Sequence, residues 1–408
     1  MTNKLTYITR YTIFALLIFT PLARGAVQGW AVTVIHMATL VALAAFLLEK
    51  NLTQSWNWIN TPLDKPILIL ITLSILSACF SLHRYTSFWS TILLFNYLTI
   101  YYLIIHTFRT RPQIHQLVYL IVGVAAFLSI FGLLKTSGNN PFPWWTYPEI
   151  TQNVDRLAST YGNANHLAGY MEMAIPLLLG LMLAGPRGVR LFLLICITLL
   201  LFLSLMLSLS RGGWIGMLSG LLFMAATLSF DNPVVKKRLV MIVVVGAFAS
   251  AVFVLSSTPT VKRILDLQQK AGLEARMAVW GGVVDMIQDH PMFGAGPGTF
   301  ATVYTQYQPP GLNRRYFAAH NDYLQLVSEA GLPVIAIMLW MIVVLYRKGF
   351  KKIKNPSRLV RGVTLGAMSG ITAILVHSVS DFNLHIPANA ILFTVLAALV
   401  TAPIPEQN

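Results

Sequence analysis

The sequence predicts an all-α polytopic membrane protein with about twelve transmembrane helices. Of its 408 residues, 56% are of the types AVILMFWYC and only 11% are charged, and the mean hydropathy is +0.67. Soluble domains carry roughly 25% charged residues, so this chain has too few ionisable groups to solvate a globular surface. Cys79 and Cys196 both lie inside apolar runs, which excludes a disulfide framework.

The apolar runs are close to the roughly 20 residues that a helix needs to cross the hydrocarbon core. The predicted spans are, in order, 8–23, 30–48, 66–82, 87–108, 115–135, 165–184, 191–209, 213–230, 239–256, 321–346, 361–380 and 386–402. Only a Ser-Arg-Gly-Gly break separates the seventh span from the eighth, so the count depends on that break. The first span has a basic start but no small-x-small cleavage site, and we expect it to be retained.

Orientation follows from the basic residues in the connections. With the N-terminus in the cytoplasm and alternating spans, 18 of the 29 Lys and Arg residues fall in short cytoplasmic connections, as the positive-inside rule predicts. They are Lys4, Arg10, Lys50, Lys65, Arg109, Arg111, Arg187, Arg190, Lys236, Lys237, Arg238, Arg347, Lys348, Lys351, Lys352, Lys354, Arg358 and Arg361. Both termini are then cytoplasmic. The net charge of +15 is mostly a topology signal and does not indicate nucleic-acid binding.

The remaining basic residues are enriched in arginine on the outward side. Eight of these eleven are Arg, and arginine is the planar, permanently charged partner of phosphate. They therefore favour an anionic ligand on that side. The alternative is that single arginines pair with outward acids, namely Asp155, Asp266, Glu274 or Asp285.

Two outward segments, 136–164 and 257–320, are too long to be turns. The first carries Trp144-Trp145 beside prolines, which predicts an interfacial anchor or, less favoured, a platform for a sugar face. In the second we expect short helices at 260–270 and 274–289.

After these expected helices, Gly294-Ala295-Gly296-Pro297-Gly298 forms a compact turn. It follows no predicted strand, so a nucleotide-binding loop is not favoured. We expect residues 1–408 to form one transmembrane helical domain with 257–320 as a long periplasmic loop.

Three outward arginines are candidates for binding an anion. Arg211 has glycines on its C-terminal side and an apolar helix on each side, although it could instead snorkel to the interface. Arg276 and Arg156 are further candidates that could pair with nearby acids.

Seven histidines could reach the outer face: His36, His83, His166, His290, His320, His377 and His385. His320 is favoured as a general base because it begins a helix among polar residues at the seam between loop and membrane. The possible supporting residues are Asn165, His166, Asp322, Tyr323 and Glu329. No metal-ligand motif and no outward Asp-x-Asp pair is present in the sequence, so we expect no metal and no cofactor, with arginine supplying the positive charge.

Together these pieces resemble the O-antigen ligase family of the O-antigen ligase/polymerase superfamily. The residues that carry the resemblance are Arg156-x5-Gly162-Asn-x-Asn165, Ser210-Arg211-Gly-Gly-Trp214, Arg276-x3-Trp280, Asp289-His290-Pro291-x-Phe293-Gly294-x-Gly296, and His320-Asn321-Asp322-Tyr323 with Glu329-x-Gly331. They span roughly residues 150–335, and their order and spacing are more specific for the superfamily than for the ligase alone.

The resemblance implies glycan transfer at the periplasmic face of the bacterial inner membrane, in a C-type glycosyltransferase-like architecture. The donor would be a glycan on undecaprenyl diphosphate and the acceptor the lipid A–core oligosaccharide, with membrane lipids as surroundings and no nucleic acid. Metal-independent transfer with inversion at the anomeric carbon is implied. Carried onto matching positions, Arg211, Arg276 and Arg156 would hold the diphosphate, and His320 would be the base.

Three alternatives stay open. A polymerase would use the same donor but extend a second lipid-linked glycan, and a protein O-oligosaccharyltransferase would deliver the glycan to Ser or Thr. A transporter is less favoured, because it predicts charged residues in mid-span and near-symmetric halves. Here Glu172 and Glu329 are the nearest exceptions to nearly uncharged spans.

Overall fold

The computed structural model describes residues 2–142, 156–229, 268–312 and 315–404, which contain helices and no β-strand. The helices are α1 (Thr2–Leu22), α2 (Gly29–Thr53), α3 (Asp64–Cys79), α4 (Arg84–Thr107), α5 (Arg111–Thr136), α6 (Ala164–Leu183), α7 (Val189–Leu207), α8 (Arg211–Ser229), α11 (Gln268–Asp289), α12 (Phe300–Val303), α13 (Asp322–Ala330), α14 (Pro333–Lys352), α15 (Arg358–His377) and α16 (Pro387–Thr401). The all-α class is therefore confirmed for the described part of the chain.

Eight helices of the described residues are long and apolar enough to cross a membrane: α1, α2, α4, α5, α6, α7, α14 and α15. Each overlaps one of the predicted spans. The runs at 66–82, 213–230 and 386–402 are also helices (α3, α8 and α16), but they do not reach that combined length and hydropathy. The predicted span at 239–256 and the Trp144-Trp145 pair lie outside the described residues, as does the part of the helix predicted at 260–270 that precedes Gln268.

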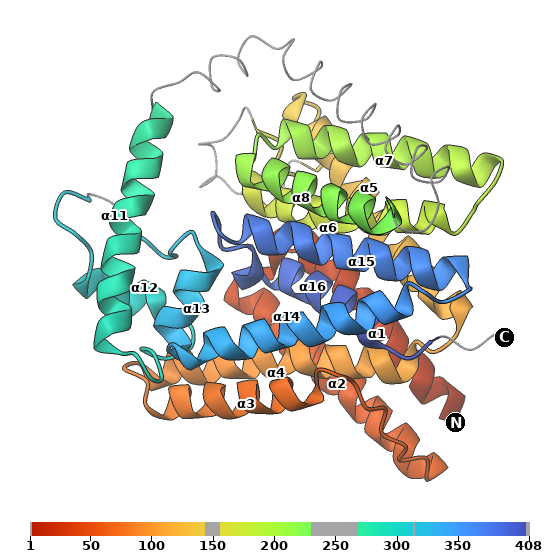
Figure 1. The fold of residues 1–408 in the computed structure, drawn as a ribbon, viewed down its shortest axis with the longest axis horizontal. Helices are drawn as coiled ribbons and strands as arrows, with labels where there is room; N and C mark the ends of the chain where they lie inside the picture. Colours follow the sequence, from red (N-terminus) through yellow and green to blue (C-terminus); the bar gives the residue numbers. More distant parts are fainter. Residues whose placement is uncertain (1, 143–155, 230–267, 313–314, 405–408) are drawn as a thin grey trace.

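Helix α6 is the centre of the bundle. Its apolar span is 94% buried inside the protein, against 78% for α15 and 22–56% for the other six candidate spans of the described residues. It packs most extensively against α15 and also contacts α5, α7, α8 and α16. In Figure 1, α7 and α8 lie above α6, and α15, α16 and α14 lie below it. The core of the fold is therefore built around α6 and α15.

Glycines let α6 and α15 approach each other closely. A Cβ atom on Gly180 would lie 2.1 Å from the Gly362 carbonyl oxygen, and one on Gly366 would lie 2.5 Å from the Pro176 oxygen. Because these neighbours are backbone atoms of packed helices, they cannot rotate away. Small residues at such crossings allow the close packing on which helix association in membranes depends.

Gly180→Ala is therefore expected to destabilise the folded protein by about 1–3 kcal/mol through overpacking. Gly123→Ala on α5 is the matched control, since nothing lies within 4 Å of a Cβ atom at that position. Thermal unfolding of the detergent-purified variants measures the difference. Equal melting temperatures for both variants would contradict this description of the α6–α15 crossing.

The expected single span at 321–346 is wrong. The chain forms two helices there, α13 and α14, separated by Gly331 and Leu332. Gly331 has φ +82°, a left-handed conformation that ends α13, and Pro333 is a favourable first residue for α14. A Cβ atom on Gly331 would lie 2.3 Å from the Met292 carbonyl oxygen, so the break also lets residues 291–294 approach.

The expected interruption between helices at 260–270 and 274–289 is also wrong, because α11 runs continuously from Gln268 to Asp289. Residues of α11, such as Val283 and Met286, pack against residues that follow it, such as Phe300 and Tyr304. Together they form a separate small hydrophobic core. This α11–α13 region lies at one end of the bundle, on the left of Figure 1. The described part of the long polar segment, from Gln268 onward, is thus a folded cap on that end.

The compact turn at 294–298 is confirmed, with positive φ at Gly294, Gly296 and Gly298. It has a structural role. The Gly298 N–H donates to Glu329 Oε2 at 2.7 Å and the Phe300 N–H donates to Glu329 Oε1 at 3.2 Å. Burial raises the pKa of Glu329, and the charge of His385 and these two hydrogen bonds oppose that rise.

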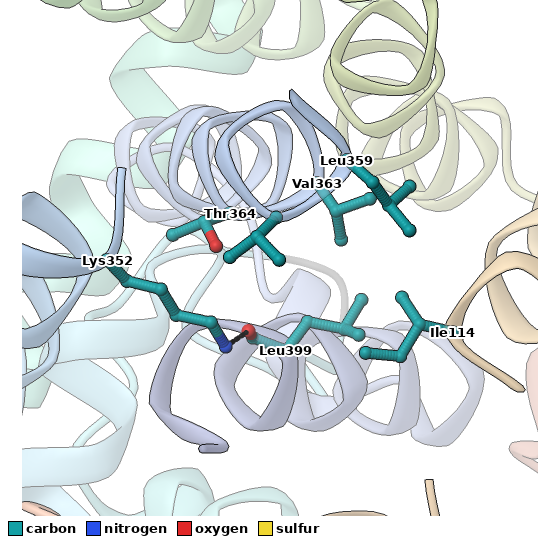
Figure 2. A pocket seen from close by; sticks show the side chains of 7 residues that line it. Ile114, Lys352, Leu359, Val363, Thr364 and Leu399 are labelled. Carbon is teal, nitrogen blue, oxygen red and sulfur yellow. Dashed lines mark hydrogen bonds between the residues drawn. The ribbon is translucent and has the colours of Figure 1, made fainter. Parts of the chain in front are cut away.

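At the opposite end of the bundle, Lys352 is buried and caps α16. Its Nζ donates to the carbonyl oxygens of Leu399 and Ala402 at 2.8 and 2.9 Å, and a small pocket beside it is lined by α5 and α15 residues such as Ile114 and Thr364 (Figure 2). A cation at a helix C-terminus complements the partial negative charge of the last carbonyls. Lys352 therefore acts as a helix cap.

Candidate active site

The loop that joins α15 to α16, residues 378–386, is contacted by four of the nine predicted site residues: His320, Arg276, His166 and Asp322. In sequence it reads Ser-Val-Ser-Asp-Phe-Asn-Leu-His-Ile, and it contains the 3₁₀ turn η5 (Asn383–His385). Polar contacts or ring contacts reach it from α6, α11, α13 and His320, and the backbone of α8 packs against it. We call this segment the 378–386 loop.

His320 lies against Asp381 of this loop. Its Nδ1 is 3.4 Å from Asp381 Oδ1, and its ring packs edge-on against Phe382 with centroids 5.0 Å apart. The His320 side chain is 31% exposed whereas that of Asp381 is 1% exposed. Because an ionised carboxylate can only accept hydrogen bonds, Nδ1–H donates to Asp381, and in the neutral ring the other nitrogen, Nε2, keeps its lone pair.

Asp381 is held as a buried anion. Burial by itself raises the pKa of this carboxyl, but the hydrogen bond from His320 and the charges of His166, His377 and His320 outweigh burial and keep the pKa well below its usual range. Its second oxygen, Oδ2, is buried and has no hydrogen-bond partner among the residues that the structure describes. A buried carboxylate beside a partly exposed imidazole is the arrangement that orients a histidine base and stabilises its protonated form.

The backbone at His320 is strained, with φ +49°. Asn321, the next residue, caps α13 by accepting from the N–H groups of Tyr323 and Leu324, both at 3.0 Å. The Trp280 indole N–H donates to the Ala319 carbonyl at 2.9 Å on the other side. Non-glycine residues with positive φ persist where surrounding contacts fix them, often at functional sites. These contacts fix where the imidazole lies.

Arg276 of α11 reaches the same loop. Its Nη1 donates to the Ser380 carbonyl oxygen at 3.1 Å, one residue before Asp381. Arg211 is the first residue of α8 and is exposed. Its neighbour Gly212 packs so closely on the loop that a Cβ atom there would lie 2.7 Å from Ser380 Oγ. The structure therefore brings Arg276, the start of α8 and His320 to one loop.

Arg156 is bound within the protein. Its Nε donates to the Ser208 carbonyl at 2.8 Å, and its Nη2 donates to the Asn165 side-chain oxygen. Arg156 and Asn165 thus link the start of α6 to the turn between α7 and α8.

The other supporting candidates hold the surroundings of the site. His166 packs edge-on against Phe382, with ring centroids 4.8 Å apart. Asp322 accepts from Ser378 Oγ at 2.7 Å and from the Leu384 N–H at 3.0 Å, and its other oxygen contacts His385. The hydroxyl of Tyr323 donates to the Leu375 carbonyl at 2.6 Å. Glu329, bound by the glycine turn, is not brought to His320.

Asp381 was missed by the sequence reasoning, as was the 378–386 loop. Asp381 stands in a short connection between two apolar runs, where an acidic residue looks like ordinary loop polarity. One signal was available in the sequence. In the alternating topology this connection lies on the outward side of the membrane, the same side as His320.

Residues 196–339 of the chain match the family model described as O-Antigen ligase. The matched segment contains Arg211, Arg276 and His320, whereas Arg156 and the 378–386 loop lie outside it. No curated protein matches the chain.

Proposed function

We propose that the chain belongs to the O-antigen ligase-type family whose model matches residues 196–339, and that it transfers a glycan from undecaprenyl diphosphate to the lipid A–core oligosaccharide. The reaction would take place at the periplasmic face of a bacterial inner membrane, within a C-type glycosyltransferase-like bundle. The observation that carries this proposal is the convergence of His320, Asp381 and Arg276 at the 378–386 loop.

In this mechanism His320 is the general base. The acceptor hydroxyl attacks the anomeric carbon of the donor sugar while His320 Nε2 takes the hydroxyl proton, and the bond from the anomeric carbon to the diphosphate oxygen breaks. Asp381 holds the imidazole through Nδ1 and stabilises the imidazolium that forms. Attack from the face opposite the leaving group inverts the anomeric configuration.

The departing undecaprenyl diphosphate carries the negative charge that the site must stabilise. We assign this role first to Arg211 and Arg276, with Arg156 as a third candidate. Arg276 can meet a phosphate oxygen while its Nη1 stays on Ser380. Arg156 already donates to Ser208 and Asn165, so its contribution would be to hold the α7–α8 turn. In this mechanism guanidinium groups supply the positive charge, and the reaction needs no metal.

The distribution of basic residues supports the proposed orientation. Helix α6 begins and α15 ends beside the 378–386 loop, so the α6–α7 and α14–α15 connections lie at the opposite end of the bundle. Arg187 and Arg190 lie at the first connection, and Lys354 and Arg358 at the second. Basic short connections are typical of the cytoplasmic side. The α11–α13 region would then face the periplasm, with both termini cytoplasmic.

Cysteine labelling tests this orientation. A cysteine introduced at Gln268, at the start of α11, should react with a membrane-impermeant maleimide in intact spheroplasts, after Cys79 and Cys196 are replaced by serine because both are exposed. The matched control is a cysteine at Lys354, which should react only after lysis. If the two positions exchange this behaviour, the topology and the periplasmic site are both wrong.

A deletion strain separates the ligase from its relatives. Loss of a ligase leaves lipid A–core without O antigen, while the polymer accumulates on undecaprenyl diphosphate. A plasmid with the wild-type gene should restore O antigen to lipid A–core. Lipid A–core that still carries a single glycan repeat would indicate a polymerase. Unchanged lipopolysaccharide with loss of glycans from proteins would indicate a protein O-oligosaccharyltransferase. Unchanged glycans of all three kinds would favour a transporter.

A further inference from the structure

A buried acid–histidine pair lies behind the site, and so far it has entered only through the charge of His377 near Asp381. His377 Nδ1 is 2.9 Å from Glu172 Oε1, and the two side chains are 1% and 0% exposed. Glu172 belongs to α6 and His377 ends α15. Neither side chain can touch a substrate because both are enclosed by protein.

The pair continues into the residue that precedes α8. With Nδ1–H donating to Glu172, the other ring nitrogen of His377, Nε2, lies 3.5 Å from the Ser210 hydroxyl. Ser210 Oγ in turn accepts from the Gly213 N–H at 3.2 Å. Polar contacts therefore run without a break from the first turn of α8 through Ser210 and His377 to the Glu172 carboxylate.

Direct packing joins the same groups. A Cβ atom on Gly212 would lie 2.5 Å from His377 Cδ2, and one on Gly216 would lie 2.6 Å from Glu172 Oε2. The backbone of α8 therefore rests on the pair with no side chain between them. Any rotation of the His377 ring would displace the first turn of α8, where Arg211 lies.

The turn before α8 needs such support. Leu209 has φ +51°, which is strained for a leucine. On one side Arg156 donates to the Ser208 carbonyl, and on the other His377 meets Ser210. The turn is clamped between these two contacts.

Holding α6 to α15 does not require the pair. The glycine crossings at Gly180 and Gly366 already bring these helices into backbone contact. A buried ion pair is weak as a source of stability, because desolvation offsets much of the attraction. Ionisable groups at membrane depth are costly and usually serve function.

We propose that the Glu172–His377 pair positions the start of α8, and through it Arg211, for binding the lipid diphosphate. The pair is a positioning device rather than a catalytic group. This inference rests on the proposed function, in which Arg211 binds the donor.

A double-mutant cycle on purified protein tests it. Binding of undecaprenyl diphosphate is measured directly for the wild type, Glu172→Ala, Arg211→Ala and the double variant, alongside donor KM, acceptor KM and kcat. Glu172→Ala should weaken donor binding about tenfold, as loss of a supporting hydrogen-bond partner does elsewhere. Acceptor KM should not change. In the Arg211→Ala background, Glu172→Ala should add no further loss.

Three further variants guard against a merely structural effect. Glu172→Gln should recover most donor affinity, because its amide oxygen can still accept from Nδ1–H. Ser210→Ala breaks the chain without leaving a buried charge and should also weaken donor binding. Asn96→Ala is the matched control: it removes another interhelical contact, the partly buried one to His36 at 2.5 Å, and should leave donor affinity unchanged.

The inference is overturned if Glu172→Ala lowers only the melting temperature, or if its effect on donor binding persists in full without Arg211. Failure of the proposed function looks different, because the wild type itself would then fail to bind undecaprenyl diphosphate.

Discussion

Replacing His320 with alanine is expected to reduce glycan transfer by about 10²–10⁴-fold, the usual contribution of a general base. The acceptor hydroxyl is a poor nucleophile, whereas the lipid diphosphate is already a good leaving group. Removal of the proton is therefore the step that most needs help. His320→Gln should be similarly impaired, because glutamine forms hydrogen bonds but cannot take the proton.

Donor binding should survive both His320 variants, since the arginines are intact, and this separates a lost base from a misfolded site. His115→Ala is the matched control. Its ring also packs on an aromatic side chain, Tyr119, but it lies near the start of α5, at the end of the bundle opposite the 378–386 loop. Purified protein with lipid-linked donor and core acceptor provides the assay. Near wild-type turnover by His320→Ala would remove the base assignment and leave Asp322 or His166, which both contact the 378–386 loop, as replacements.

Lysine is expected not to rescue Arg211 or Arg276. For Arg276 the reason is geometric: one arm of the planar guanidinium is fixed on the Ser380 carbonyl, and only a fork can keep that contact and also meet a phosphate. Loss of one preorganised donor to developing charge costs about 10²–10³ in rate. The effect should fall on donor binding as well as on turnover.

Arg187→Lys, an exposed position in the α6–α7 connection, should leave both donor affinity and rate unchanged. Both quantities are measured with the same donor titration for all three lysine variants. Full activity in Arg211→Lys and Arg276→Lys would show that plain positive charge suffices, and would end the argument for bidentate contacts.

Much of the fold could be predicted from the sequence because a helix that spans a membrane requires a long apolar run. The break at Ser210-Arg211-Gly-Gly separated α7 from α8 as predicted. The split of 321–346 was missed although Gly331 and Pro333 are ordinary helix stop and start signals. The apolar run continues through both residues, and the prediction gave its hydropathy more weight than these stop and start signals.

Only part of the candidate site could be predicted from the sequence, for a different reason. His320 stood out because polar residues surround it in the sequence, whereas Asp381 follows it by 61 positions and meets it only in the folded bundle. Lys352 shows the same limit: it counted as one charge of a basic connection, yet it is buried against the end of α16. Which charges are solvated depends on packing that hydropathy does not describe.

The most direct test of the central claim is transfer by the purified protein from an undecaprenyl diphosphate-linked glycan to lipid A–core in the presence of EDTA. We predict a lipid A–core product that bears the glycan with an inverted linkage, formed at the same rate with and without the chelator. No such product, or activity abolished by EDTA and restored by Mg²⁺, would contradict a mechanism in which His320, Asp381 and arginine carry the reaction.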